Sequence, residues 1–373
     1  MLLRYCLCIF TFLHYSFANA EADSFSINVF QDESDRLFIE QTIENFMRKY
    51  QIPGLSIAIA RQEEIIFAKG YGFADIEKKV PVNITHKFRI ASVSKPVTSV
   101  AIMKLREQGK LSLEDKVFGT GGILANDYHV EDELLKQITV RHLLEHTAGK
   151  EWANDSHDPM FQKPDLSQAA TIRWVLKHRR LTKVPGTEYA YSNFGYCILG
   201  RVIEKLSGIG YQHYVRKNIF LPVGVKSFSM GNKKPANSLF QVRYYPDTDE
   251  SPYWFNVERM DSHGGWISNA IDLVKFSMSV DGLGEDILNK ESIKIMTTPS
   301  KRNSNYSLGW NVNQYNNWWH NGSLPGTASI LVRTEHGYSW AVLLNKRSED
   351  KHFLGDLDKL SWNLISGIKA LKH

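Results

Sequence analysis

Hydrophobic residues near the start of the chain recur with two different periods, which predict a helix followed by a hairpin. From Ser34 to Tyr50, apolar side chains return every three to four residues, as on an amphipathic helix. Two short apolar runs follow, Leu55 to Ala60 and Ile65 to Ala68, with a charged tetrapeptide between them. Such runs predict two antiparallel strands. The segment Gly70 to Gly72 predicts a turn after the second strand.

The pattern is mainly helical in the middle of the chain and strand-like again near its end. One helix is expected from just after Ser92 to Gln108, and another from Asn193 to Leu206, ended by Gly208. Thr139 is expected to cap a further helix. The later segments comprise three strand-like runs and a closing amphipathic helix: 309–312, 328–333, 340–344 and 354–371.

This separation of strands from helices predicts an α+β fold. One antiparallel sheet would combine the N- and C-terminal parts, with helices on its faces and a mainly helical region inserted. With 373 residues and 43% hydrophobic composition, the chain can bury a large core. We expect a single domain over 21–373, with a sheet subdomain at about 35–91 and 300–373 and a mainly helical subdomain at about 92–299.

Residues 1–20 resemble a signal peptide. Arg4 precedes an apolar run over 5–17, and Ala18-Asn19-Ala20 provides a small-x-small cleavage site. The alternative is a buried N-terminal helix. No later run reaches the ~18 apolar residues of a membrane span, so we expect a secreted or periplasmic protein without a stable span. After cleavage Cys197 would be the only cysteine, and its apolar surroundings predict a buried small hydrophobe.

Charge argues against a nucleic-acid partner. The net charge of +5 is spread over 45 basic and 40 acidic residues, without the clustered basic stripe that nucleic-acid binding requires. A nucleic-acid partner is therefore not expected; the motifs described below imply a small-molecule or peptide substrate as the partner instead.

Ser92 and Lys95 form an S-x-x-K pattern at the start of a long apolar helix. Residues three apart share a helix face, so the lysine amine can reach the serine hydroxyl. A serine needs a base to become a nucleophile, and a lysine serves if burial keeps it partly neutral. The spacing recurs at Ser348, in a charged stretch, and at Ser366, inside the closing helix. The local setting therefore favours Ser92.

Two further short patterns place polar groups on suitable loops and strands. Tyr191-Ser192-Asn193 lies between a Pro-Gly turn and a helix start, whereas Tyr315 begins a second Y-x-N in a polar turn. His320-Asn321-Gly322 enters a predicted strand, where glycine lets a substrate backbone approach closely. His263 begins a second H-x-G. Taken singly, such tyrosines and histidines are more often packed core residues than catalytic ones.

One pattern suggests a metal instead. The segment from His142 to His146 reads H-x-x-E-H, an arrangement found in zinc hydrolases. It lacks a third ligand, and Gly149 soon ends the helix, so we expect a pair of polar residues at a helix end and no metal. The sequence has no phosphate-binding loop, dinucleotide motif or G-x-S-x-G, and no cofactor is expected.

The order of the three patterns is more specific than any one of them. Ser92-x-x-Lys95, Tyr191-x-Asn193 and His320-x-Gly322 together resemble the class C β-lactamase and D-alanyl-D-alanine carboxypeptidase superfamily of penicillin-recognising serine hydrolases. Connecting segments are similar too, over 141–149, 185–208 and 264–273. The resemblance covers roughly residues 40–345 and implies the β-lactamase/transpeptidase-like fold.

The resemblance also implies an acyl-enzyme mechanism with Ser92 as nucleophile. Lys95 and Tyr191 would share the transfer of its proton, and which of them is the formal base stays open. The backbone N–H groups of Ser92 and Ser323 would form the oxyanion hole. No metal or cofactor would be needed.

Other site roles follow from the same resemblance. Asn193 would hold a substrate amide, and Gly322 would belong to the substrate-binding strand. His320 would donate a hydrogen bond to Tyr191 or to a substrate carboxylate.

One departure from the β-lactamase pattern affects the expected substrate. β-Lactamases carry K-T-G as the third motif, and imidazole anchors a carboxylate more weakly than lysine does. The resemblance therefore points to an ester, an amide or a D-amino-acid peptide. The alternative function is a catalytically silent binding or scaffold protein of this fold, with an aromatic surface made by Trp310, Trp318 and Trp319.

Overall fold

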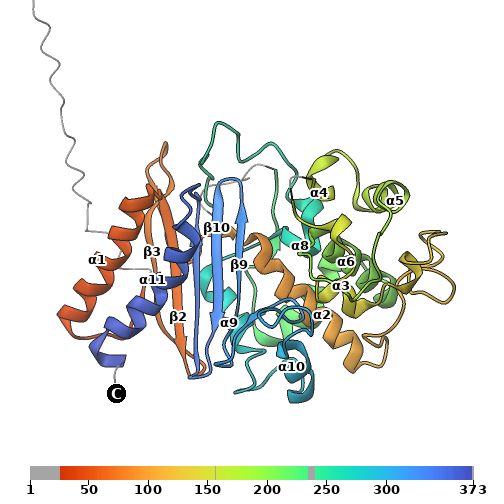
Figure 1. Ribbon diagram of the computed structural model, residues 1–373. Coiled ribbons are helices and arrows are strands. Elements are labelled where there is room, and N and C mark those ends of the chain that lie inside the picture. The colour runs from red at the N-terminus through yellow and green to blue at the C-terminus, as the bar shows by residue number, and fades with distance from the viewer. Residues whose placement is uncertain (1–25, 156, 234–239, 372–373) are drawn as a thin grey trace, which may run out of the picture.

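The computed structural model describes residues 26–155, 157–233 and 240–371, and its largest element is an antiparallel sheet. The sheet has eight strands in the order β1-β3-β2-β11-β10-β9-β8, and β4 pairs with β3. N-terminal strands thus lie beside C-terminal ones (Figure 1), which confirms the predicted α+β class. The strands of this sheet are β1 (Ile27–Asn28), β2 (Gly54–Arg61), β3 (Glu64–Asp75), β4 (Val80–Pro81), β8 (Asn311–Val312), β9 (Trp318–Leu324), β10 (Thr327–Arg333) and β11 (Tyr338–Leu344).

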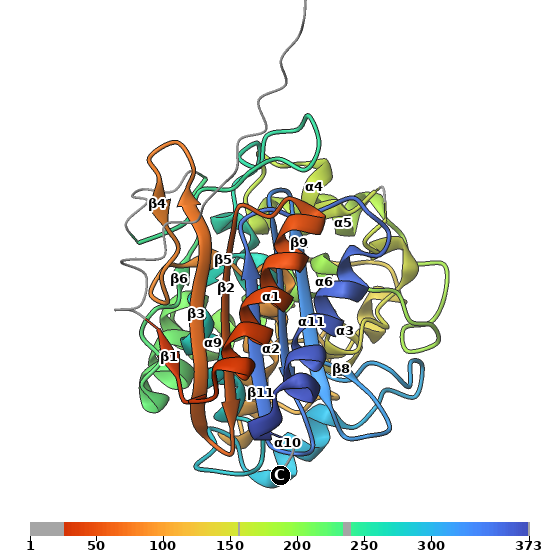
Figure 2. The same cartoon turned by 90° about the vertical axis from the view of Figure 1, so that its left-hand side faces the viewer.

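Helices cover both faces of this sheet. The terminal helices α1 and α11 lie side by side on one face (Figure 2), and α9 packs on β2 and β11 from the other. Strand β2 shows why both faces are covered. Leu55, Ile57 and Ile59 join the core under α1 and α11, while Ala58 and Ala60 join the core of the helical region. Successive side chains of a strand point to opposite faces, so a nearly continuous apolar run requires two covers.

The helical region between the two halves of the sheet carries a second, small sheet. Its strands β5 (Phe88–Arg89), β7 (Trp266–Ser268) and β6 (Ser229–Met230) pair in the order β5-β7-β6. The α-helices are α1 (Glu33–Tyr50), α2 (Ser94–Glu107), α3 (Val140–Leu144), α4 (Pro159–Gln162), α5 (Gln168–His178), α6 (Asn193–Ser207), α7 (Tyr211–Val215), α8 (Asp261–Gly264), α9 (Ala270–Met278), α10 (Lys290–Thr297) and α11 (Phe353–Gly367).

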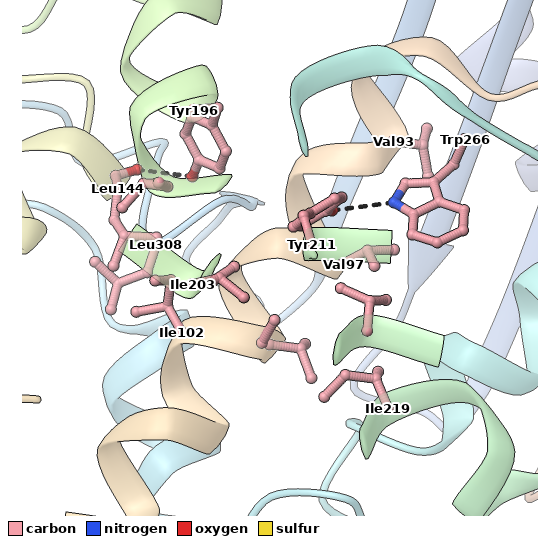
Figure 3. Packing of buried hydrophobic residues seen from close by; sticks show 14 of the residues in the cluster. Val93, Val97, Ile102, Leu144, Tyr196, Ile203, Tyr211, Ile219, Trp266 and Leu308 are labelled. Atoms are coloured by element: carbon pink, nitrogen blue, oxygen red, sulfur yellow. Dashed lines mark hydrogen bonds between the residues drawn. The ribbon is translucent and has the colours of Figure 1, made fainter. Parts of the chain in front are cut away.

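Helix α2 runs through the middle of this region and is almost entirely buried. Val97 and Ile102 pack among apolar side chains from several other elements, including Ile203 of α6 (Figure 3). A helix that is apolar on all sides needs such surroundings. Its first turn is therefore fixed in position, and that turn carries Lys95.

The predicted elements agree with the structure in most places. Asp32 caps α1 and Thr139 caps α3 through their side chains, and Gly208 ends α6 with positive φ. The turn expected at Gly70 to Gly72 was wrong, because β3 continues to Asp75. A Cβ on Gly70 would overlap the carbonyl oxygen of Val82, so glycine serves close backbone packing there.

The closing helix is shorter than expected. Helix α11 ends at Gly367, and a 3₁₀ turn follows over Lys369–Leu371. Within the described ranges no helix is both long and apolar enough to cross a membrane. The predicted signal peptide at 1–20 lies outside the described residues.

Candidate active site

Ser92 lies at the junction between the small sheet and α2. It belongs to a 3₁₀ turn, η2 (Ala91–Val93), which follows β5 almost directly. Ala91, the residue before it, has a φ of 47°, a left-handed conformation that costs a non-glycine residue energy. Such strain persists only where the surroundings hold it, and here it turns the chain sharply into the helix.

The Lys95 amine is buried against Ser92. Its Nζ donates to Ser92 Oγ at 3.0 Å, to Asn193 Oδ1 at 2.7 Å and to the His263 carbonyl at 2.9 Å. Burial lowers the pKa of Lys95 to about 7, and the Asp158 carboxylate works in the opposite direction. The amine is therefore partly neutral near neutral pH, the condition for a base.

Asn193 connects this lysine to a buried carboxylate. Its Nδ2 donates to Asp158 Oδ2 at 2.8 Å, while its backbone N–H donates to Asn154 Oδ1 at 2.8 Å. With Oδ1 accepting from Lys95, one amide hydrogen is left for a substrate. Burial raises the pKa of Asp158, and its hydrogen bonds with Met160 N–H and Asn193 and the Lys95 charge act against that rise.

Tyr191 lies over the same amine. Lys95 Nζ is 4.8 Å from the centroid of its ring, and the phenol hydrogen-bonds with Ser92. Burial raises the pKa of Tyr191 well above its ordinary value. The phenol thus stays protonated at neutral pH, in contrast to the amine.

His320 lies behind Tyr191, with ring centroids 6.2 Å apart. Its Nδ1 is 2.6 Å from the carbonyl oxygen of Asn321, and its Nε2 is 3.3 Å from the Tyr306 hydroxyl. Burial and the nearby Lys95 lower the pKa of His320 to about 3. The ring is therefore neutral.

Gly322 packs β9 against the turn η2 that carries Ser92. A Cβ at this position would overlap the Ile90 carbonyl oxygen and Ser329 Oγ, and would lie 3.0 Å from the Ala91 Cβ. The glycine thus lets the protein's own backbone approach closely. The sequence had suggested that the space serves a substrate backbone instead. Ser323 follows Gly322 in β9. Strand β8 pairs only with Trp318 and Trp319 of β9, so β8 does not extend to Ser323.

Three of the seven site residues line one cavity of about 160 Å³, and Lys95, Tyr191, His320 and Gly322 are not on its wall. Ser92, Asn193 and Ser323 lie on its wall, together with the apolar side chains of Phe161, Met260 and Leu324 and others. Arg347 also lines it. Asp247 pairs with this guanidinium, and Arg347 Nη1 lies 3.4 Å from Ser323 Oγ.

Some competing sequence patterns lie away from the site, whereas His263 of the second H-x-G and His146 of the zinc pattern lie in it. Ser366 is exposed, and Tyr315 is 67% exposed. The nitrogens of His146 face Ser192 N–H and the Tyr306 hydroxyl, and no group of three or more potential ligands occurs in the described ranges. Trp310 and Trp318 are buried, which leaves Trp319 of the three tryptophans partly accessible for the aromatic surface of the alternative function.

Comparison with known families agrees with this geometry. The family model described as Beta-lactamase matches residues 39–360. The chain belongs to this family. All seven residues assigned to the site from the sequence lie within the matched range, at 92, 95, 191, 193, 320, 322 and 323.

The following individual relatives and solved structures match this chain with less than 30% identical residues. Protein flp of Staphylococcus aureus (strain N315) is 28% identical over 321 residues, which cover 83% of this chain but only 63% of that protein. A penicillin-binding protein of Bacillus subtilis (strain 168) is 25% identical, covering 90% of this chain and 77% of its own. The D-amino acid amidase of Ochrobactrum anthropi SV3 superposes with a TM-score of 0.76 at 22% identity, covering 91% of this chain and all of its own. A penicillin-binding protein homologue from Pyrococcus abyssi has a TM-score of 0.75 at 24% identity, over 91% and 79% of the two chains.

Sequence reasoning missed several polar groups around this family site. Asp158, Asn154 and Tyr306 belong to none of the three patterns, yet each hydrogen-bonds with a residue of the site. Asp158 carried one local signal, because an aspartate before a proline is typical of a helix N-cap, and it does cap α4. In the sequence His146 belongs to the H-x-x-E-H pattern and to the segment 141–149 that resembles the family, and neither assigns it a place in the site.

Proposed function

We propose that this protein is a secreted serine hydrolase that forms an acyl-enzyme at Ser92 and acts on an ester, an amide or a D-amino-acid peptide. The observation that carries the proposal is the buried Lys95 amine, 3.0 Å from Ser92 Oγ and with a pKa of about 7. A lysine in an ordinary surface position would be protonated and could not accept the serine proton.

Acylation begins with the neutral form of Lys95. Its amine takes the hydroxyl proton of Ser92 while Oγ forms a bond to the substrate carbonyl carbon. The negative charge moves to the carbonyl oxygen, where the N–H groups of Ser92 and Ser323 would stabilise it. Each such donor is typically worth ~10²–10³ in rate.

Collapse of this intermediate breaks the bond to the leaving group. Tyr191 donates its phenol proton to the leaving nitrogen or oxygen, and the Lys95 ammonium returns the proton that it received from Ser92 to the phenolate oxygen. Water then attacks the acyl carbon and gives one proton to the amine, and Ser92 Oγ leaves and recovers it. The sum is hydrolysis, with Lys95 and Tyr191 unchanged.

The substrate class is supported by the cavity and by the relatives. Its volume of about 160 Å³ is below the ~300 Å³ at which drug-sized pockets begin, so a small acyl group fits it. Phe161, Met260 and Leu324 offer apolar contact for that group. The amidase among the structural neighbours acts on a D-amino acid amide by its name.

Covalent labelling tests the proposal. Wild type should gain one fluorophosphonate adduct on the Ser92 peptide and should hydrolyse at least one member of a panel of short esters, D-alanyl amides and β-lactams. Ser92→Ala should lose both properties, whereas Ser348→Ala, at a second S-x-x-K, should keep both. Saturable ligand binding without turnover or label in wild type would instead establish the silent binding protein.

Secretion needs its own experiment. Expression in a host with a secretory pathway should place the protein outside the cytoplasm, and N-terminal sequencing should begin at Glu21. An intact N-terminus at Met1 would contradict the signal peptide.

A further inference from the structure

His146 contacts both sides of Tyr191. Its carbonyl oxygen accepts from Ala190 N–H at 2.7 Å, and its ring Nδ1 accepts from Ser192 N–H at 3.0 Å. The ring itself packs on the Tyr191 ring with centroids 4.3 Å apart. One residue thus holds the backbone before and after this tyrosine and also supports its side chain.

The backbone of His146 is unusual in a way that this arrangement explains. Its φ is 58°, in the left-handed region that few non-glycine residues adopt, just after α3 ends. This turn brings its carbonyl oxygen and its ring to the same loop. A strained residue is kept only where the surrounding contacts compensate, which here are the two bonds to the loop of Tyr191.

The hydrogen bonds of His146 continue to His320. Its Nε2 lies 3.0 Å from the Tyr306 hydroxyl, and that hydroxyl lies 3.3 Å from His320 Nε2. Tyr196 does not supply the connecting proton, because its hydroxyl donates to the Leu144 carbonyl at 3.0 Å (Figure 3). All three connected side chains are buried.

The direction of each bond in this chain follows from its two ends. A backbone N–H only donates, so His146 Nδ1 holds a lone pair and the proton of the neutral ring is on Nε2. That N–H donates to Tyr306, whose own proton can go to His320 Nε2 or to the Tyr196 hydroxyl, which also hydrogen-bonds with Tyr306, and the far end of the chain selects His320. At the far end, the Asn321 carbonyl only accepts, so His320 must carry its proton on Nδ1. Both ends are thus consistent with one direction.

We propose that His146 is a positioning residue for Tyr191 and that, through Tyr306, it holds His320 as a hydrogen-bond acceptor in a single tautomer. The first half rests on the proposed catalytic role of Tyr191, and the second half does not. In this arrangement His320 presents no N–H to Tyr191 or to a substrate carboxylate, unlike the donor role that the family resemblance implied for it.

Two substitutions of His146 separate the two halves. Asn places an oxygen near the Nδ1 position and can still accept from Ser192 N–H, whereas Gln places an N–H near the Nε2 position and can still donate to Tyr306. His146→Gln should therefore lower kcat more than His146→Asn, about tenfold against about threefold, with KM changed less than twofold. His146→Gln should keep the hydrogen bonds that lead to His320 Nε2, and His146→Asn should weaken them; because the Asn321 carbonyl still favours protonated Nδ1, the population of that tautomer should fall in His146→Asn without reversing.

Nitrogen NMR of protein labelled in its histidines reads the tautomers directly. In wild type His320 should show protonated Nδ1 and bare Nε2, and His146 the reverse; single variants of each histidine assign the signals. Tyr306→Phe should reduce the preference at His320 to what the Asn321 carbonyl alone maintains. Tyr189→Phe is the matched control, because this ring packs against Tyr306 at 5.7 Å but its hydroxyl is outside the chain of bonds. Thermal unfolding curves establish that each variant is folded.

Each result decides one half of the inference. Protonated Nε2 on His320 in wild type would overturn the tautomer assignment. Equal loss of kcat in the Asn and Gln variants, or a larger loss with Asn, would overturn the positioning role. Failure of the wild type to label at Ser92 and to hydrolyse any ester would overturn the proposed function and the positioning role with it, while the NMR result would still decide the tautomer.

Discussion

Neutralising Asp158 should shift the pH dependence of Ser92 reactivity. Asp158→Asn removes the charge and keeps one acceptor oxygen, so it also loses one of two hydrogen bonds, the one that Oδ2 accepts from Asn193 Nδ2 or the one that Oδ1 accepts from Met160 N–H. The Asp158 carboxylate raises the pKa of Lys95, which burial has lowered to about 7. Without this carboxylate the ammonium form of Lys95 is less stable and its pKa falls further. Since the neutral amine is the active form, the rise of activity with pH should move to lower pH.

The distance between the charges sets the size of this effect. Hydrogen bonds of 2.7 and 2.8 Å connect Lys95 to Asn193 and Asn193 to Asp158. With the amide between them the charges are roughly 7 Å apart, and at an effective dielectric constant of about 20 such a pair interacts by about 2 kcal/mol. One pH unit corresponds to ~1.4 kcal/mol, so the midpoint should fall by about one pH unit or slightly more.

The assay is the second-order rate of fluorophosphonate labelling between pH 4 and pH 9, read by intact mass. It needs no knowledge of the natural substrate. Asp155→Asn is the matched control, because it removes the same charge from an exposed position in the same loop. An unchanged midpoint in Asp158→Asn would show that Lys95 is not the titrating base or that Asp158 does not act on it, and a midpoint at higher pH would reverse the reasoning.

Three further predictions concern other parts of the site and the core. Gly322→Ala should force β9 away from the Ile90 carbonyl. The free energy of unfolding in urea titrations should fall by about 1–3 kcal/mol, and the rate of fluorophosphonate labelling should fall at least tenfold. Unchanged values would contradict this packing. Tyr191→Phe should slow hydrolysis of amides about 10²-fold but that of nitrophenyl esters much less, because nitrophenolate leaves without a proton; equal losses would argue against an acid role. Burial raises the pKa of the Cys197 thiol to about 12, so iodoacetamide at pH 8 should modify its peptide, in mass spectra, only after unfolding.

Local sequence was sufficient where a structural feature depends on a few neighbouring residues. The period of apolar residues placed α1 and the β2–β3 pair, and side-chain caps such as Thr139 marked helix starts. It failed at Gly70, where the reason for a glycine is the Val82 backbone packed against it rather than a turn. A glycine pattern shows that space is required and does not show what fills it.

The sequence by itself determined the class of fold, the family and the candidate nucleophile. Ser92 and Lys95 are three residues apart at a helix start, so the helix alone brings them together. Only the tertiary structure decided the environment that gives these groups their chemistry. The pKa of Lys95 depends on its burial and on Asp158, and the contacts of His320 Nε2 lead through Tyr306 to His146, which is 174 positions away in the chain. Desolvation and hydrogen-bond direction are set by which distant segments come into contact, and no local pattern records them.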